Sequence, residues 1–187
     1  YFSTALSASS LSLVNNTDML TKVYFPCLIF PLTPVFSKLV DFVISFAVVF
    51  VLMAWFHVAP TARMLYLPLL ILLMMLATAG ISLWFAAMSV HYRDVKHAMP
   101  FLTQILMYAA PVVWSAALIE ERFGQVGRLV FGLYPMVGVI EGFRVALLDT
   151  GPMPWDMLAA GTVSALLLFV TGLFYFRRME VNFADVA

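Results

Sequence analysis

Long uncharged apolar runs alternate with short polar segments along this chain. A membrane-crossing helix needs about 20 apolar residues to cover roughly 30 Å of hydrocarbon. Runs of suitable length lie at 35–56, 64–90, 98–119 and 157–176. Residues 1–14 are also uncharged, but they are few and serine-rich, which suits the end of a span that begins upstream. The pattern predicts an all-α, polytopic membrane helix bundle.

Composition supports a lipid environment. The 187 residues are 64% hydrophobic and 11% charged, whereas a soluble domain is about half apolar and a quarter charged. The net charge is zero, so nothing indicates a nucleic-acid partner. The single cysteine excludes an internal disulfide framework. The chain starts with neither Met nor a basic segment, so we expect it to be N-terminally truncated.

The distribution of Lys and Arg predicts the orientation. Segments 15–38, 91–97 and 177–187 hold more of these residues than the connections between them, and basic residues favour the cytoplasmic side. The first set comprises Lys22, Lys38, Arg93, Lys96, Arg177 and Arg178. The opposite connections hold Arg63, Arg122 and Arg128. We expect 15–34 and the tail 177–187 to be cytoplasmic.

Residues 129–148 are apolar but broken by Pro135, Gly138 and Gly142. If this segment crossed the membrane, the basic tail would lie outside, against the charge rule. If it enters and returns on the outer side, all three basic segments share one side. Irregular backbone at membrane depth is tolerated only against protein or a wet cavity. We therefore predict a re-entrant helix pair before the last span.

Glu141 and Arg144 lie on one helix face of that segment, at i and i+3. Charges at membrane depth are costly, and they usually face a water-filled path or each other. Two interpretations stay open. The pair either forms the polar rim of an outward-facing pore or is a self-neutralising pair at the outer interface.

The stretch "VNNTDMLTKVYFP" (14–26) has the pattern of a two-turn amphipathic helix. Asn16 or Thr17 can cap it, acidic Asp18 suits its first turn, and Pro26 ends it. An apolar stripe on one face could lie on the bilayer or dock a soluble partner. That stripe and its polar neighbours comprise Asp18, Met19, Leu20, Lys22, Val23 and Tyr24.

Other residues carry weaker signals. Lys38 and Asp41 are expected to mark the inner membrane boundary, with the lysine snorkelling. An aromatic subset is a candidate for lining a channel, although packing is the commoner role for such side chains. The subset comprises Trp84, Phe85, Tyr108 and Trp114. The spacing of His91, Asp94 and His97 matches no zinc signature, and the chain has no phosphate-binding loop and no hydrolase motif.

Four motifs in order carry a family resemblance: "SLVNNTDMLTKVYFP", "HYRDVKHAMPFL", "YPMVGVIEGFRVALL" and "YFRRMEVNFADV". Together they cover essentially the whole chain, which resembles the permease subunit of type-2 ABC exporters. The likeness is greatest to the branch that exports lipid-linked polysaccharides such as O-antigen, capsule and teichoic acid. Members of that family commonly have arginine where this chain has Cys27, and "NP" where it has Tyr134–Pro135.

The resemblance implies roles for these segments. Residues 15–34 would be the cytoplasmic region that couples to a separate ABC ATPase subunit, with Asp18 to Tyr24 in contact with it. Residues 129–148 would be the outer gate, including Tyr134, Pro135, Glu141 and Arg144. The subunit would act as a homodimer in the bacterial cytoplasmic (inner) membrane, among membrane lipid. It would have no cofactor of its own, because the partner subunit binds ATP.

The expected function is therefore transport of a lipid-linked glycan rather than catalysis. An exporter of a drug or lipid is the alternative within transport. An intramembrane enzyme and a membrane scaffold without transport activity are alternatives from other classes. No nucleophile–base pair or metal pair supports the enzyme.

Overall fold

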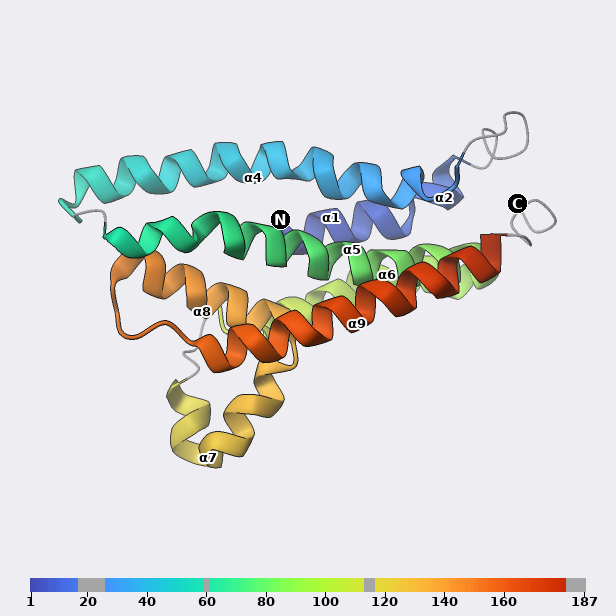
Figure 1. Cartoon of the computed structure of the whole chain (residues 1–187). Coiled ribbons are helices and arrows are strands. Elements are labelled where there is room, and N and C mark those ends of the chain that lie inside the picture. The colour runs from blue at the N-terminus through green and yellow to red at the C-terminus, as the bar shows by residue number, and fades with distance from the viewer. Residues whose placement is uncertain (17–25, 59–60, 113–116, 181–187) are drawn as a thin grey trace.

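The computed structural model describes residues 1–16, 26–58, 61–112 and 117–180. The described residues form helices and no strand, which confirms the all-α fold class. Long helices lie roughly side by side along one axis, and α7 projects from them (Figure 1). The elements are α1 (Phe2–Ser10), α2 (Ser12–Asn15), α4 (Ile29–Trp55), η1 (Ala62–Tyr66), α5 (Leu67–His91), α6 (Arg93–Ala109), α7 (Ala117–Gly132), α8 (Pro135–Leu148) and α9 (Trp155–Glu180).

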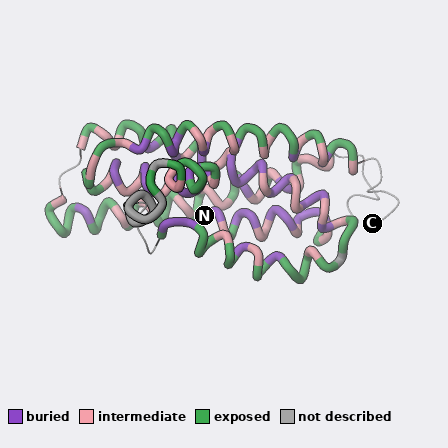
Figure 2. Tube along the Cα trace, turned by 90° about the horizontal axis from the view of Figure 1, so that it is seen from below, coloured by how far each residue is buried: buried purple, intermediate pink, exposed green. Residues whose placement is uncertain are grey.

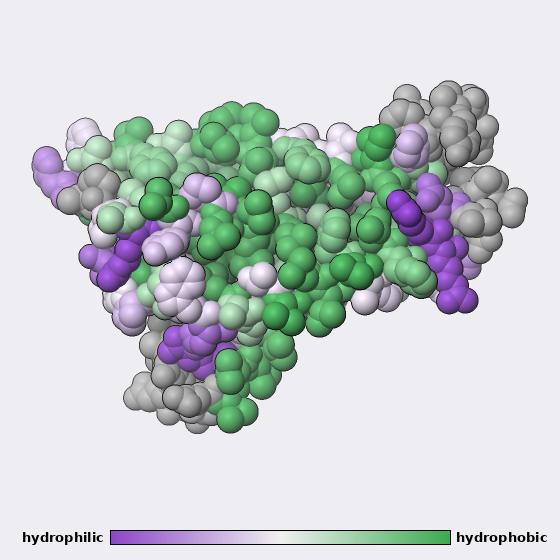
Figure 3. Space-filling model, in the orientation of Figure 1, coloured by the Kyte–Doolittle hydropathy of each residue, from purple (hydrophilic) through white to green (hydrophobic). Residues whose placement is uncertain are grey.

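Among the described residues, three helical segments are long and apolar enough to cross a membrane: Ile29–Trp55, Ala62–His91 and Trp155–Glu180. The central one is α5, because 61% of its most apolar window is buried, compared with 6% for α4. Figure 2 shows buried positions concentrated toward the middle of the bundle. In Figure 3, apolar side chains cover the middle of the visible face and hydrophilic ones gather toward its ends. A peripheral apolar helix such as α4 is stable where lipid is the solvent.

Two helices differ in extent from the predicted spans. Helix α4 begins at Ile29, inside the segment 15–34 that was assigned to the coupling region. The third predicted span, 98–119, was wrong as a continuous helix, because α6 runs from Arg93 and ends at Ala109. The residue before a proline avoids the α region, and Ala110, which precedes Pro111, is extended with ψ 144°. The proline therefore ends the helix.

Helices α5 and α9 cross at backbone contact. A Cβ added to Gly80 would lie 2.7 Å from the backbone nitrogen of Phe169, and one added to Gly172 would lie 2.8 Å from the carbonyl oxygen of Gly80. Small residues permit such close approach between membrane helices. This crossing fixes the centre of the bundle, around which the other helices pack.

The two ends of the bundle differ. One end holds the start of α4 and the ends of α5 and α9 (Figure 1). There, Leu13 and Phe176 are fully buried in one apolar cluster with residues of α5. The three predicted basic segments thus lead to the same end, as a re-entrant 129–148 requires. The opposite end holds the α4–α5 and α8–α9 connections. That the first end faces the cytoplasm stays a prediction.

Candidate functional site

The bent helix pair predicted from the sequence is present. Val126–Gly132 and Pro135–Leu148 are apolar helices joined by a short break and bent by 101°. Tyr134 is extended with ψ 109°, as the residue before a proline prefers, and Pro135 starts α8. Helix α8 then runs back toward the end of the bundle that holds the α4–α5 connection (Figure 1). A broken span and a re-entrant pair both have this geometry, so that the segment is re-entrant stays a prediction.

Close packing against α9 holds the turn in place. A Cβ on Gly161 would lie 3.2 Å from the Cα of Pro135, and one on Gly138 would lie 2.9 Å from the carbonyl oxygen of Met157. The hydroxyl of Tyr134 donates a hydrogen bond of 3.2 Å to the carbonyl of Leu106 on α6. The turn is therefore supported by two different helices.

Glu141 and Arg144 form an ion pair on α8. Nη1 of Arg144 donates to Oε1 of Glu141 at 2.7 Å, and the two side chains are only 26% and 11% exposed. Nη2 of the same guanidinium donates to the carbonyl of Pro111 at 2.8 Å. That carbonyl follows the end of α6, where backbone acceptors have no partner within the helix. Arg144 therefore joins α8 to the end of α6 and neutralises Glu141 at the same time.

This geometry bears on the two interpretations of the pair. The two side chains bond each other, and the guanidinium also donates to a backbone carbonyl. The arrangement supports a structural tie within the gate segment rather than an open polar rim. The role of these residues in a gate stays a prediction.

Two further ion pairs connect helix ends, and the sequence did not identify them. Arg63 donates to Asp149 and, at 2.5 Å, to the carbonyl of Gly151, so it links η1 to the α8–α9 connection. Arg128 of α7 pairs with Asp156 at the start of α9 at 2.7 Å. These partners lie far apart in the chain. The only sequence feature that indicated a charge interaction here was an acidic residue in the first turn of α9.

Asp149 also has an unusual backbone. Its φ of 52° lies in the left-handed region, where it ends α8. Asp tolerates this conformation better than most residues. The glycine-favouring φ of 65° at Gly124 similarly marks a kink inside α7.

At the opposite end, the segment before α4 lies against the end of α9. The backbone N–H of Cys27 donates to the Glu180 carboxylate at 3.2 Å. Burial, followed by the negative charge of Glu180 and a hydrogen bond to it, raises the pKa of the Cys27 thiol. The residues assigned to ATPase coupling, Asp18, Met19, Leu20, Lys22, Val23 and Tyr24, lie outside the described residues.

The aromatic candidates for a channel lining do not form one group. Trp84 stacks on Tyr175 of α9 with ring centroids 4.5 Å apart and donates to the Thr171 hydroxyl at 3.3 Å. Phe85 packs against the main apolar core. Tyr108 is 63% exposed on α6. Trp114 lies outside the described residues. The contacts of Trp84 and Phe85 are those of packing residues, whereas Tyr108 is open to a partner or a channel.

Helix α6 has a buried side and a mixed exposed side. Met99 and Thr103 are buried, whereas the exposed side combines His97 and Gln104 with Phe101. Lipid does not solvate a histidine or an amide well. Within the described residues, no group of three or more His, Cys, Asp or Glu side chains could hold a metal ion.

Comparison with known proteins gave no matching family model. The chain is 26% identical, over 186 residues, to an O-antigen export system permease protein of Myxococcus xanthus; the match covers 99% of this chain and 70% of that protein. Two proteins of the same description from Klebsiella pneumoniae are each 20% identical over 187 residues, again 70% of their length. The resemblance to the type-2 ABC permeases of the O-antigen export branch is therefore confirmed along the whole chain.

Proposed function

We propose that this chain, a relative of the O-antigen export permeases over its whole length, is the membrane-spanning subunit of an ATP-driven exporter of lipid-linked polysaccharide. The full-length similarity to three such permeases carries the proposal. Those relatives are described as permeases, so this subunit transports and does not catalyse. The protein is an integral, multi-pass protein of the bacterial inner membrane, with several apolar helices of membrane length.

The proposed exporter is a homodimer of this subunit with two cytoplasmic ABC ATPase subunits. The proposed energy source is ATP, which those ATPase subunits hydrolyse. ATP binding shifts the permease between two conformations only if the ATPase binds them with different affinity. The segment 15–34 is the proposed docking region, and its last residues form the start of α4, which begins at Ile29.

The bent pair α7–α8 is the proposed outer gate. Its support comes from residues of α6 and α9, through Tyr134, Arg144 and the close contact at Gly138. Movement of α6 relative to α9 would therefore change both supports of the gate at once. The exposed side of α6, with Gln104 and Tyr108, is the proposed channel wall. An exporter of a drug or lipid is less consistent with these relatives.

Copurification and export together test this function. The full-length permease is expected to bind its ATPase in fixed ratio and to deliver labelled glycan across the membrane of inverted vesicles only with ATP. Met19→Asp together with Val23→Asp is expected to reduce ATPase binding and export, because the apolar stripe needed for docking is lost. The variant Thr150→Asp, at an exposed position after α8, is the control for added charge. Undiminished export by the Met19/Val23 variant would contradict the docking role.

A further inference from the structure

Two ion pairs join the bent pair α7–α8 to neighbouring helices. Arg128 lies near the start of the bent pair and contacts Asp156 of α9. Asp149 directly follows the end of α8 and contacts Arg63 of η1. We call these two contacts the anchoring ion pairs. They attach the bent pair to the rest of the bundle at both of its ends.

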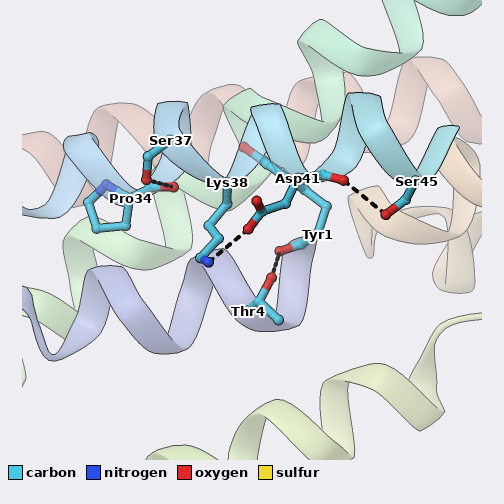
Figure 4. A network of polar contacts seen from close by, with 7 residues as sticks. All are labelled: Tyr1, Thr4, Pro34, Ser37, Lys38, Asp41 and Ser45. Carbon is cyan, nitrogen blue, oxygen red and sulfur yellow. Dashed lines mark hydrogen bonds and ion pairs between the residues drawn. The ribbon is translucent and has the colours of Figure 1, made fainter. Parts of the chain in front are cut away.

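Two other ion pairs stay within a single helix. Lys38 and Asp41 are at i and i+3 on α4, with Nζ 2.8 Å from Oδ2 (Figure 4). Glu141 and Arg144 have the same spacing on α8. An ion pair within one helix persists when that helix moves as a unit. An anchoring ion pair, in contrast, breaks when the two elements that it joins move apart.

The contact between Arg128 and Asp156 involves both carboxylate oxygens. Nε of Arg128 lies 2.7 Å from Oδ2 of Asp156, and Nη2 donates to Oδ1 at 3.1 Å. Contact with both oxygens fixes the orientation of the guanidinium as well as its position. Asp156 lies in the first turn of α9, where the helix dipole favours a negative charge. This ion pair therefore holds the end of α7 against the start of α9.

Arg63 holds both the end of α8 and the connection that follows it. Its guanidinium donates to the Asp149 carboxylate and, at 2.5 Å, to the carbonyl of Gly151. The ring of Tyr66, in the same short helix, packs edge-on against Trp155, with ring centroids 5.2 Å apart. Because Tyr66 directly precedes α5, these contacts join the end of α8 to the start of α5.

The ends of the bent pair are easier to release than its turn. The side chains of the anchoring ion pairs are between 28% and 49% exposed. Ion pairs that water reaches contribute little to stability, and salt weakens them. The turn instead rests on the backbone of α9, through the close contact of Gly138 with Met157. Separating that contact displaces a whole helix, whereas an ion pair breaks through a small movement at one end.

We propose that the anchoring ion pairs hold the outer gate closed and separate when it opens. This rests on the proposed function, in which α7–α8 is that gate, and it adds the contacts that control the gate. One ion pair attaches the gate to η1 and α5, and the other attaches it to α9. An opening movement away from these helices breaks the charge contacts, which form again when the gate returns. The four charged residues are thus positioning residues of the gate.

Reversible cross-linking tests the proposal in the full-length permease–ATPase complex. In a cysteine-free background that includes Cys27→Ala, one variant carries Arg128→Cys with Asp156→Cys, and another carries Arg63→Cys with Gly151→Cys. Gly151 has room for the new side chain, because an added Cβ would meet no atom within 4 Å. A short bifunctional thiosulfonate joins the two thiols, and a reducing agent releases them. Cross-linking either pair is expected to lower ATP-driven export at least roughly tenfold, and reduction to restore it, since a gate that cannot move blocks passage.

Trp84 and Tyr175 supply the matched control for cross-linking. Their rings stack between α5 and α9 with centroids 4.5 Å apart. Cysteines cross-linked at these two positions are expected to leave export unchanged, because the backbones of the two helices already touch. Full export with either anchoring pair cross-linked would overturn the proposal, and so would an equal loss of export in the control. A parent complex that exports no glycan before cross-linking would instead refute the proposed function.

Removal of the negative charges tests the ion pairs themselves. Asp149→Asn and Asp156→Asn keep the size of each side chain, and Asn tolerates the left-handed backbone of position 149. In vesicles that hold the complex without ATP, the double variant is expected to raise the leak of a small charged dye several-fold, with ATPase binding unchanged. Asp41→Asn is the matched control, because it removes a carboxylate from an ion pair within one helix. A leak no greater than that of the control would overturn the role of these charges.

Discussion

The contact between α8 and α9 at Gly138 can be tested with two alanine substitutions on one helix. A Cβ at Gly138 would lie 2.9 Å and 3.0 Å from the carbonyl oxygen and carbon of Met157, which are backbone atoms and cannot rotate away. A Cβ at Gly142 would instead meet the Leu70 side chain at 2.7 Å, and the Cδ atoms of leucine can move. The same substitution thus meets a rigid neighbour at one position and a flexible one at the other.

The magnitudes follow from two opposing terms. Alanine is more favourable than glycine within a helix by roughly 0.5–1 kcal/mol at either position. Overpacking against a rigid neighbour costs about 1–3 kcal/mol. Gly142→Ala is therefore expected to be neutral or slightly stabilising. Gly138→Ala should be less stable than Gly142→Ala by about 1–3 kcal/mol, because the helix-propensity term cancels in the comparison.

Thermal unfolding of the detergent-purified permease measures the difference. One kcal/mol shifts the midpoint of a chain of this size by roughly 2–4 °C. The midpoint of Gly138→Ala should therefore lie about 2–12 °C below that of Gly142→Ala. Gly151→Ala, where no atom lies within 4 Å of the added Cβ, is the control. If Gly138→Ala is as stable as Gly142→Ala, α8 does not pack on α9 as described.

Two further outcomes are expected. Arg144→Gln removes the cation beside Glu141, which is nine-tenths buried, so this substitution should lower the thermal midpoint. Adding Glu141→Gln to the same protein should restore part of the loss. No recovery in the double variant would contradict the ion pair. The raised pKa of Cys27 predicts slow alkylation near pH 7 that accelerates as pH rises, and Glu180→Gln should shift that rise to lower pH because it removes the negative charge. An identical pH profile in both proteins would refute the contact between Glu180 and Cys27.

The sequence predicted those features that depend on local pattern. Apolar runs identified the long helices, and Pro135 with its neighbouring glycines identified the bent pair. The charge rule placed the three basic segments on one side of the membrane, and in the structure the start of α4 and the ends of α5 and α9 lie at one end of the bundle. The end of α6 was missed although Pro111 signalled it, because the apolar run continues through residue 119 and hydropathy was given more weight than the proline.

Features that depend on distant residues could not be predicted. Arg63 and Asp149 lie 86 positions apart, and no pattern around either residue indicates that the two side chains form an ion pair. That Lys38 and Asp41 mark the inner membrane boundary stays a prediction, because their ion pair gives no level in a membrane.

The crossing of α5 and α9 at Gly80 and Gly172 has a mechanical consequence. With no side chains between the two backbones, neither helix has room to slide or rotate over the other without steric overlap. These helices would act as a stiff frame during a transport cycle. Displacement would then fall to the helices around this frame, among them α6 and the bent pair α7–α8 of the proposed gate.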